Sequence, residues 1–154
     1  MANTYTQLYI QFVFAVKYRQ SLIQPEWEDE LYKYITGIMQ NHKHKMIAIN
    51  GMPDHIHIFI GFHTTQSIAE LMKVVKGDSA EWINGRQFVK GHFRWQEGYG
   101  AFTYSRSHID RVYHYILNQK DHHARQAFLK EYMRMLEEHG VEYDERFIFH
   151  PPME

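Results

Sequence analysis

The feature that most constrains the fold is a continuous apolar run near the N-terminus, residues 7–16 (QLYIQFVFAV). Its β-branched and aromatic side chains are typical of a buried strand. Two further stretches, residues 45–50 and 55–62, flank the turn Gly51-Met52-Pro53-Asp54 and predict a hairpin. We therefore expect a sheet whose strands pair antiparallel.

Helical patterns separate and follow these strands. Pro25 suits the first turn of a helix, and Ser67 with Glu70 forms a capping box at the start of another. Ser107 with Asp110 is expected to cap a third. The expected elements are a strand at 7–16, a helix at 25–41, the hairpin, a helix from 68, a strand, glycine loop and strand within 92–104, and helices at 108–119 and 121–139.

The order β-α-β-β-α-β-α-α predicts an α+β protein, an antiparallel β-sheet with helices on one face. At 154 residues, with no internal repeat or linker, we expect one domain over residues 1–154. The absence of cysteine excludes disulfide scaffolds, zinc knuckles and thiol nucleophiles. We see no signal peptide and no apolar run long enough to span a bilayer, so we expect a cytoplasmic protein and no membrane partner.

Charge is nearly balanced, with a net charge of −1 and a pI of about 6.9, which disfavours a nonspecific nucleic-acid binder. Its distribution is uneven, because the middle of the chain carries basic residues with few acids between them. A basic face that contacts a nucleic-acid backbone is therefore one interpretation, and charges scattered over a solvated surface are the other. The candidate contacts are Lys73, Lys76, Arg86, Lys90, Arg94 and Arg111.

Two histidines stand out within the second hairpin strand. Residues two apart on a strand share a face, so His55 and His57 point the same way and Ile56 points into the core. Two imidazoles on one face can bind one divalent metal. A merely polar strand face is the alternative.

The helix expected at 108–119 carries a tyrosine on its polar side. Tyr115 lies one turn before Gln119 on the same face, whereas Tyr113 lies in the apolar stripe expected to pack. A phenol beside a basic residue and a carboxamide can act as a nucleophile, with the amide oxygen as a metal ligand. An exposed surface tyrosine is the alternative.

These residues resemble a known family. His55-Ile56-His57 is similar to the HUH signature of single-strand DNA nucleases, two histidines around a bulky apolar residue. Residues 115–119 (YILNQ) with His122-His123 resemble the tyrosine motif of the single-tyrosine HUH transposases, which include small insertion-sequence transposases and their REP-associated tyrosine transposase relatives. Further matches follow in order at 17–19 (KYR), 73–79, 95–102 (WQEGYGAF) and 140–147 (GVEYDERF).

The resemblance implies a ferredoxin- or RRM-like HUH fold and a metal-dependent strand transfer. His55, His57 and Gln119 would hold Mg²⁺ or Mn²⁺, and Tyr115 would attack phosphorus to form a 5′-phosphotyrosine bond. We expect Arg111 and the metal to help the phenol ionise. No nucleotide cofactor is expected, since the chain has no Walker-type glycine loop.

The resemblance also implies single-stranded DNA with hairpin ends as the substrate, and a homodimer whose sheets merge. In several family members the tyrosine helix completes the partner's site. The strand within 92–104 and the loop before His108 are where such a merger or exchange is expected.

Three alternatives remain open. The chain could be a domesticated enzyme that processes genomic REP hairpins, although its compact length favours the mobile-element type. It could be a catalytically silent hairpin-binding protein, against which stands the presence of all four expected chemical residues. It could be a histidine-rich metal protein or zinc hydrolase, which the absence of HExxH or a cysteine set disfavours.

Overall fold

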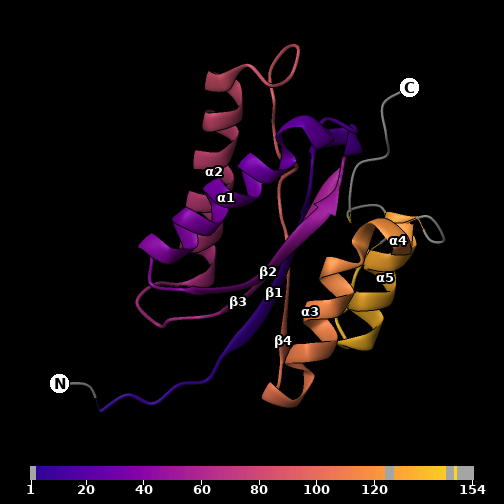
Figure 1. Cartoon of the computed structure of the whole chain (residues 1–154). Coiled ribbons are helices and arrows are strands. Elements are labelled where there is room, and N and C mark those ends of the chain that lie inside the picture. The colour runs from indigo at the N-terminus through magenta and orange to yellow at the C-terminus, as the bar shows by residue number, and fades with distance from the viewer. Residues whose placement is uncertain (1–2, 124–126, 145–147, 149–154) are drawn as a thin grey trace.

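Figure 1 shows the computed structural model, which describes residues 3–123, 127–144 and 148. Four strands form one antiparallel sheet in the order β2-β3-β1-β4. The strands are β1 (Tyr9–Ala15), β2 (Lys45–Met52), β3 (His55–Gly61) and β4 (Gly100–Tyr104). The helices are α1 (Pro25–Asn41), α2 (Ile68–Arg86), α3 (Ile109–Leu117), α4 (Gln119–His123) and α5 (Phe128–Glu138), with short 3-10 turns at Lys17–Arg19 and Arg106–His108.

The predicted α+β class and antiparallel sheet are confirmed, but helices lie on both faces of the sheet rather than on one. Helices α1 and α2 cover one face, and α3, α4 and α5 lie on the opposite side (Figure 1). The central strand explains the difference, because every residue from Ile10 to Val16 is buried. A strand without polar alternation needs cover on both sides.

The first face forms the larger core. Alternate residues of β1 and β3, among them Phe12, Phe14, Ile56 and Ile58, pack against the apolar sides of α1 and α2. Trp95 closes one end of this core, with its ring edge-on to Phe14 at 4.8 Å between centroids. This layer stabilises the sheet, and it lies on the opposite face from His55 and His57.

The core on the second face is smaller, and it contains buried polar side chains as well as apolar ones. Val13, Ala15 and Phe102 pack with buried residues of α5, and Phe59 packs with Val112 and Ile116 of α3. His55 and His57 belong to this same face, since they pair with Ala15 and Val13 across the sheet. Helices α3 and α5 therefore cover the two histidines, and apolar side chains of both helices surround them.

The β2–β3 hairpin places Asp54 directly before His55. A Cβ at Gly51 would collide with the backbone oxygen of His55, so only glycine fits this position of β2. The turn is anchored from outside, because Val16 donates its N–H to the Asp54 carbonyl at 2.8 Å.

Several predicted boundaries are corrected. The helix expected at 121–139 is divided, since α4 ends at His123, residues 124–126 lie outside the described part, and Ala127 before α5 is extended. Within 92–104 only Gly100–Tyr104 is a strand, and Trp95 makes a single bridge to Val16.

The two expected helix caps have different outcomes. The cap at Ser67 is confirmed, because its Oγ accepts the Glu70 N–H at 3.1 Å. The cap expected from Ser107 is wrong, since a 3-10 turn leads into α3 and His108 precedes it without a side-chain cap.

In the described part of the chain, no helix has both the length and the apolar character needed to cross a bilayer.

Truncating the first core should destabilise the protein strongly. Ile58 is fully buried, so Ile58→Ala should lower the free energy of unfolding by about 2–5 kcal/mol through lost burial and a cavity. Urea denaturation measures this change. Leu8→Ala, at a side chain that is 40% exposed, is the control and should cost about 0.5 kcal/mol or less. Equal effects of the two changes would contradict this account of the core.

Candidate active site

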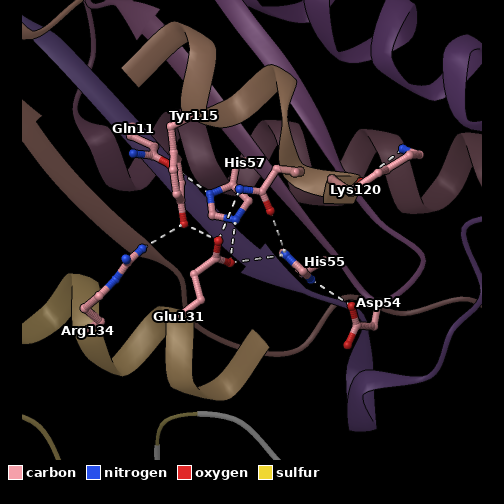
Figure 2. A network of polar contacts seen from close by, with 10 residues as sticks. Gln11, Asp54, His55, His57, Tyr115, Lys120, Glu131 and Arg134 are labelled. Carbon is pink, nitrogen blue, oxygen red and sulfur yellow. Dashed lines mark hydrogen bonds and ion pairs between the residues drawn. The ribbon is translucent and has the colours of Figure 1, made fainter. Parts of the chain in front are cut away.

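Strand β3 brings two buried imidazoles to one face of the sheet, as predicted. His55 and His57 are both fully buried, and their ring centroids lie 5.2 Å apart. Figure 2 shows them at the centre of a polar network that also draws on β1, α3 and α5. The ring of Phe128 stacks on His55 at 3.7 Å between centroids.

Each histidine has its outer nitrogen held by an oxygen. His55 Nδ1 lies 2.7 Å from Asp54 Oδ1, and His57 Nδ1 lies 2.7 Å from Gln11 Oε1. The Gln11 amide is itself oriented, because its Nε2 donates to the Tyr104 hydroxyl at 3.0 Å. Both Nδ1 atoms are therefore assigned as N–H donors, which leaves the Nε2 lone pairs directed inward. This arrangement is typical of metal-binding histidines.

Helix α3 is fastened to the strand pair that carries the histidines. Asn50 Nδ2 donates to the Leu117 carbonyl at 3.0 Å. One residue beyond Gln119, Lys120 Nζ donates to the Gly51 carbonyl at 3.2 Å and lies 3.2 Å from Glu28 Oε2. These contacts hold the end of α3 and the start of α4 against β2.

This placement reverses one prediction about α3. Tyr115 is half-buried and Gln119 is fully buried, whereas Tyr113 is exposed. Tyr113 was expected to pack because it continues the apolar stripe. Tyr115 turns inward instead, because Glu131 and Arg134 of α5 offer partners to its hydroxyl there.

Glu131 of α5 completes the network. It is 1% exposed, and its Oε1 lies 3.2 Å from His57 Nε2 and 3.7 Å from His55 Nε2. Its Oε2 accepts from Gln119 Nε2 at 3.2 Å and from the Tyr115 hydroxyl. The Gln119 oxygen in turn faces His55 Nε2 at 3.4 Å.

These donor atoms form a set that a cation can satisfy. His55, His57 and Glu131 each offer a ligand atom, and the three atoms lie within 4.8 Å of one another. Two imidazole lone pairs, a carboxylate oxygen and the Gln119 amide oxygen converge, which is unfavourable unless a proton or a metal ion lies between them. Imidazole and oxygen ligands together suit a divalent metal. The residues present therefore fit such an ion.

Tyr115 contacts this group through its hydroxyl. Burial first, and then the charge of Glu131, raise the pKa of the phenol well above its usual range. Arg134 opposes the rise in pKa, with its Nη2 3.4 Å from the Tyr115 hydroxyl. The phenol is thus protonated and donates to the Glu131 carboxylate.

The contributors missed from the sequence include Gln11, Glu131 and Arg134. Gln11 interrupts an apolar strand, and Glu131 lies within the apolar stripe of α5 marked by Phe128, Tyr132 and Met135. A buried polar residue on an otherwise apolar face was the available signal for both. Arg134 is exposed and gave none.

The predicted basic contacts lie in two places. Five of them belong to α2 and the segment after it, on the face opposite the histidines: Lys73, Lys76, Arg86, Lys90 and Arg94. Lys76 Nζ donates to the carbonyls of Gln96 and Gly98, and Arg86 pairs with Glu30 at 3.4 Å. Lys76 and Arg94 line one cavity of about 830 Å³.

Arg111, by contrast, is on α3 and lines a smaller cavity beside Tyr115. The guanidinium found within reach of the phenol oxygen is that of Arg134.

Comparison with known families gives this arrangement a context. Residues 4–119 match the family model described as transposase IS200 like. The chain belongs to the IS200-like transposase family. As a transposase of this family it is an enzyme, and the matched part ends at Gln119, so that α5 lies beyond it.

Individual relatives agree with the family. The ISDra2 transposase TnpA of Deinococcus radiodurans is 28% identical over 124 residues, which cover 75% of this chain and 86% of the relative. A crystal structure of a transposase from Deinococcus radiodurans is 25% identical, with a TM-score of 0.63, and covers 77% of this chain and 95% of its own.

A third similarity concerns the fold alone. A REP-associated tyrosine transposase, solved bound to a REP hairpin, is 12% identical to this transposase with a TM-score of 0.61. The match covers 100% of this chain and 97% of the other. It therefore extends over α5 as well as the sheet.

His55 should make the metal-free protein sensitive to acid. Burial, above all, lowers its pKa from 6.5 to about 4, so between these pH values the unfolded chain binds a proton that the folded chain lacks. The free energy of unfolding should therefore fall as the pH drops through this range, by on the order of 3 kcal/mol at most.

Urea denaturation in chelator, at several pH values from about 7 to about 4, measures this effect. His55→Gln should flatten the dependence, and His63→Gln, at an exposed histidine, is the matched control. A profile that His55→Gln leaves unchanged would contradict the assignment.

Proposed function

We propose that this transposase cleaves and rejoins single-stranded DNA through a 5′-phosphotyrosine bond to Tyr115. The observation that carries the proposal is the position of the Tyr115 hydroxyl, which contacts the same carboxylate that faces both buried histidines. A nucleophile and a metal-binding set thus meet within one chain. The resemblance of residues 55–57 and 115–119 to the HUH and tyrosine motifs supports the same roles.

In the proposed step the Tyr115 oxygen attacks phosphorus, the P–O3′ bond breaks and the Oη–P bond forms. The phenol proton passes to Glu131 Oε2, which already accepts its hydrogen bond, and water protonates the departing 3′ oxygen. Because one phosphoester replaces another, a 3′-OH can later attack the phosphotyrosine bond and rejoin strands. No nucleotide cofactor is needed.

The metal ligands in this proposal are His55, His57 and Gln119, with Glu131 as a further oxygen donor. A bound Mg²⁺ or Mn²⁺ would polarise the scissile phosphate and stabilise the charge that develops on its oxygens. Asp54 and Gln11 orient the two imidazoles for this purpose. The buried surround of the histidines excludes water that would compete with the phenol.

The proposed substrate is single-stranded DNA with hairpin ends. The structural relative solved with a REP hairpin supports this class of ligand. Arg111, which lines the cavity beside Tyr115, is assigned a backbone contact near the cleaved phosphate. Lys73, Lys76, Arg86, Lys90 and Arg94, on the opposite face of the sheet, are assigned contacts to more distant parts of the DNA. We propose that all six belong to a single domain over residues 1–154. Aromatic and basic side chains together suit single-strand binding.

We further propose a homodimer formed through the edge of the sheet. Among the described residues, strand β4 is an outer strand in the order β2-β3-β1-β4, so its outer edge can pair with the same strand of a second chain. The Tyr115 hydroxyl contacts Glu131, which faces His55 and His57, and on this geometry we propose that Tyr115 acts on the histidines of its own chain.

A second candidate is the processing of genomic REP-type hairpins without mobilisation of an element. One observation favours it, because the fold of the REP-associated relative matches the whole chain whereas the Deinococcus structure matches 77% of it. Both candidates use the same cleavage chemistry. They differ in whether the chain acts on the ends of its own element.

Tyr115→Phe should abolish formation of the covalent adduct, because it removes the attacking oxygen. The assay incubates protein with Mn²⁺ and pooled hairpin DNAs labelled at the 3′ end, and scores label that migrates with the protein on a denaturing gel. Chelator should also abolish the adduct. Tyr113→Phe is the matched control on the same helix and should leave the adduct unchanged, since that ring is exposed. DNA binding without an adduct would favour a silent binding protein.

The same assay distinguishes action within one chain from action across the dimer. A mixture of Tyr115→Phe and His57→Ala chains, co-refolded to exchange subunits, should remain inactive, because neither chain has both groups. Recovery of adduct to about a quarter of the wild-type level would instead place the tyrosine in the partner's site, because half of the dimers are mixed and each mixed dimer has one complete site of two.

A further inference from the structure

Helix α5 brings a guanidinium to the nucleophile from outside the family-matched stretch. Arg134 Nη2 lies 3.4 Å from the Tyr115 hydroxyl, and its guanidinium carbon lies 5.9 Å from the centre of the ring. In Figure 2, Arg134 approaches the phenol oxygen from the side away from His55. The family model ends at Gln119, so this side chain adds to what the shared motifs supply.

A cavity opens at this side of the tyrosine. It has a volume of about 270 Å³, and its lining includes Tyr115, Arg134, Arg111 and His108 together with the carboxylate of Glu138. Two helices therefore direct one arginine each to the same space, Arg111 from α3 and Arg134 from α5. A small cavity with two guanidinium groups beside a nucleophile is suited to a phosphodiester group.

Arg134 forms an exposed ion pair with Glu138, so its guanidinium can also bind an anion. Its Nε lies 3.8 Å from Glu138 Oε1, and the two side chains are 46% and 61% exposed. Such an exposed ion pair contributes little to stability. A phosphate at the cavity can therefore replace Glu138 as the partner of the guanidinium.

We propose that the phosphodiester on which Tyr115 acts lies between the histidine–Glu131 group and this cavity, and that Arg134 contacts one of its non-bridging oxygens from the cavity side. This inference rests on the proposed function, and Arg134 is a catalytic residue in it. The bonds made and broken are those of the cleavage step above. As the Oη–P bond forms, negative charge grows on the non-bridging oxygens, and the guanidinium stabilises it.

The first test removes the charge of Arg134 and compares it with a neighbouring charge on the same helix. Arg134→Gln should slow adduct formation under single-turnover conditions by about 100-fold, the usual loss for one donor at the developing charge. Arg134→Lys should recover part of the rate. Lys130→Gln removes the same charge at an exposed position one turn earlier in α5 and should stay within about twofold of wild type.

The second test separates contact with phosphate from mere positioning of Tyr115. A methylphosphonate at the scissile position replaces one charged oxygen with a methyl group. If Arg134 neutralises that charge, the loss caused by Arg134→Gln should shrink to a few-fold on this substrate. An equal loss on both substrates would overturn the proposal and make Arg134 a positioning residue.

The outcomes also separate this inference from the proposed function. A wild-type chain that forms no adduct contradicts the proposed function, and the inference falls with it. A wild-type chain that forms the adduct, with Arg134→Gln as fast as Lys130→Gln, overturns the inference alone.

Discussion

The site depends on four acceptors that face one another: two imidazole nitrogens, a carboxylate oxygen and an amide oxygen. Neighbours fix this arrangement, because Asp54 and Gln11 hold the outer nitrogens of the histidines and so direct the inner lone pairs toward Glu131. Left without a cation, such a cluster opposes the packing of α5 on the sheet. The apolar contacts of α5 must offset this repulsion, and they do so around the stacked ring of Phe128.

The two faces of the sheet differ in content: one carries the large apolar core and the other carries the polar cluster around His55 and His57. One face carries the large core with α1 and α2, where polar groups are few. The other face accepts a polar cluster because two smaller apolar groups flank it, one around Phe102 and one around Phe59. A site of this kind is held rigidly, since His55 and His57 stand on a strand and packed helices cover them. Tyr115 is held in place by a contact from β2 to the end of α3.

Local patterns in the sequence predicted the sheet, the hairpin and the shared face of His55 and His57, because strand periodicity depends only on neighbouring residues. They failed where partners distant in sequence decide the outcome. The apolar stripe of α3 predicts a buried Tyr113, but Tyr113 is exposed and Tyr115 turns inward, because the interior next to α3 is polar. Glu131 was missed for the same reason, since a carboxylate on an apolar helix face acquires its meaning only from what it packs against.

Strand β1 lies at the centre of the sheet and contributes to both cores. A slip of one residue in its pairing would exchange its two faces, so that phenylalanines would face the histidines and Gln11 would enter the large core. A chain trapped in that arrangement would lose the oxygen that orients His57 together with its stability. The same register of β1 thus determines both the packing of the large core and the orientation of His57.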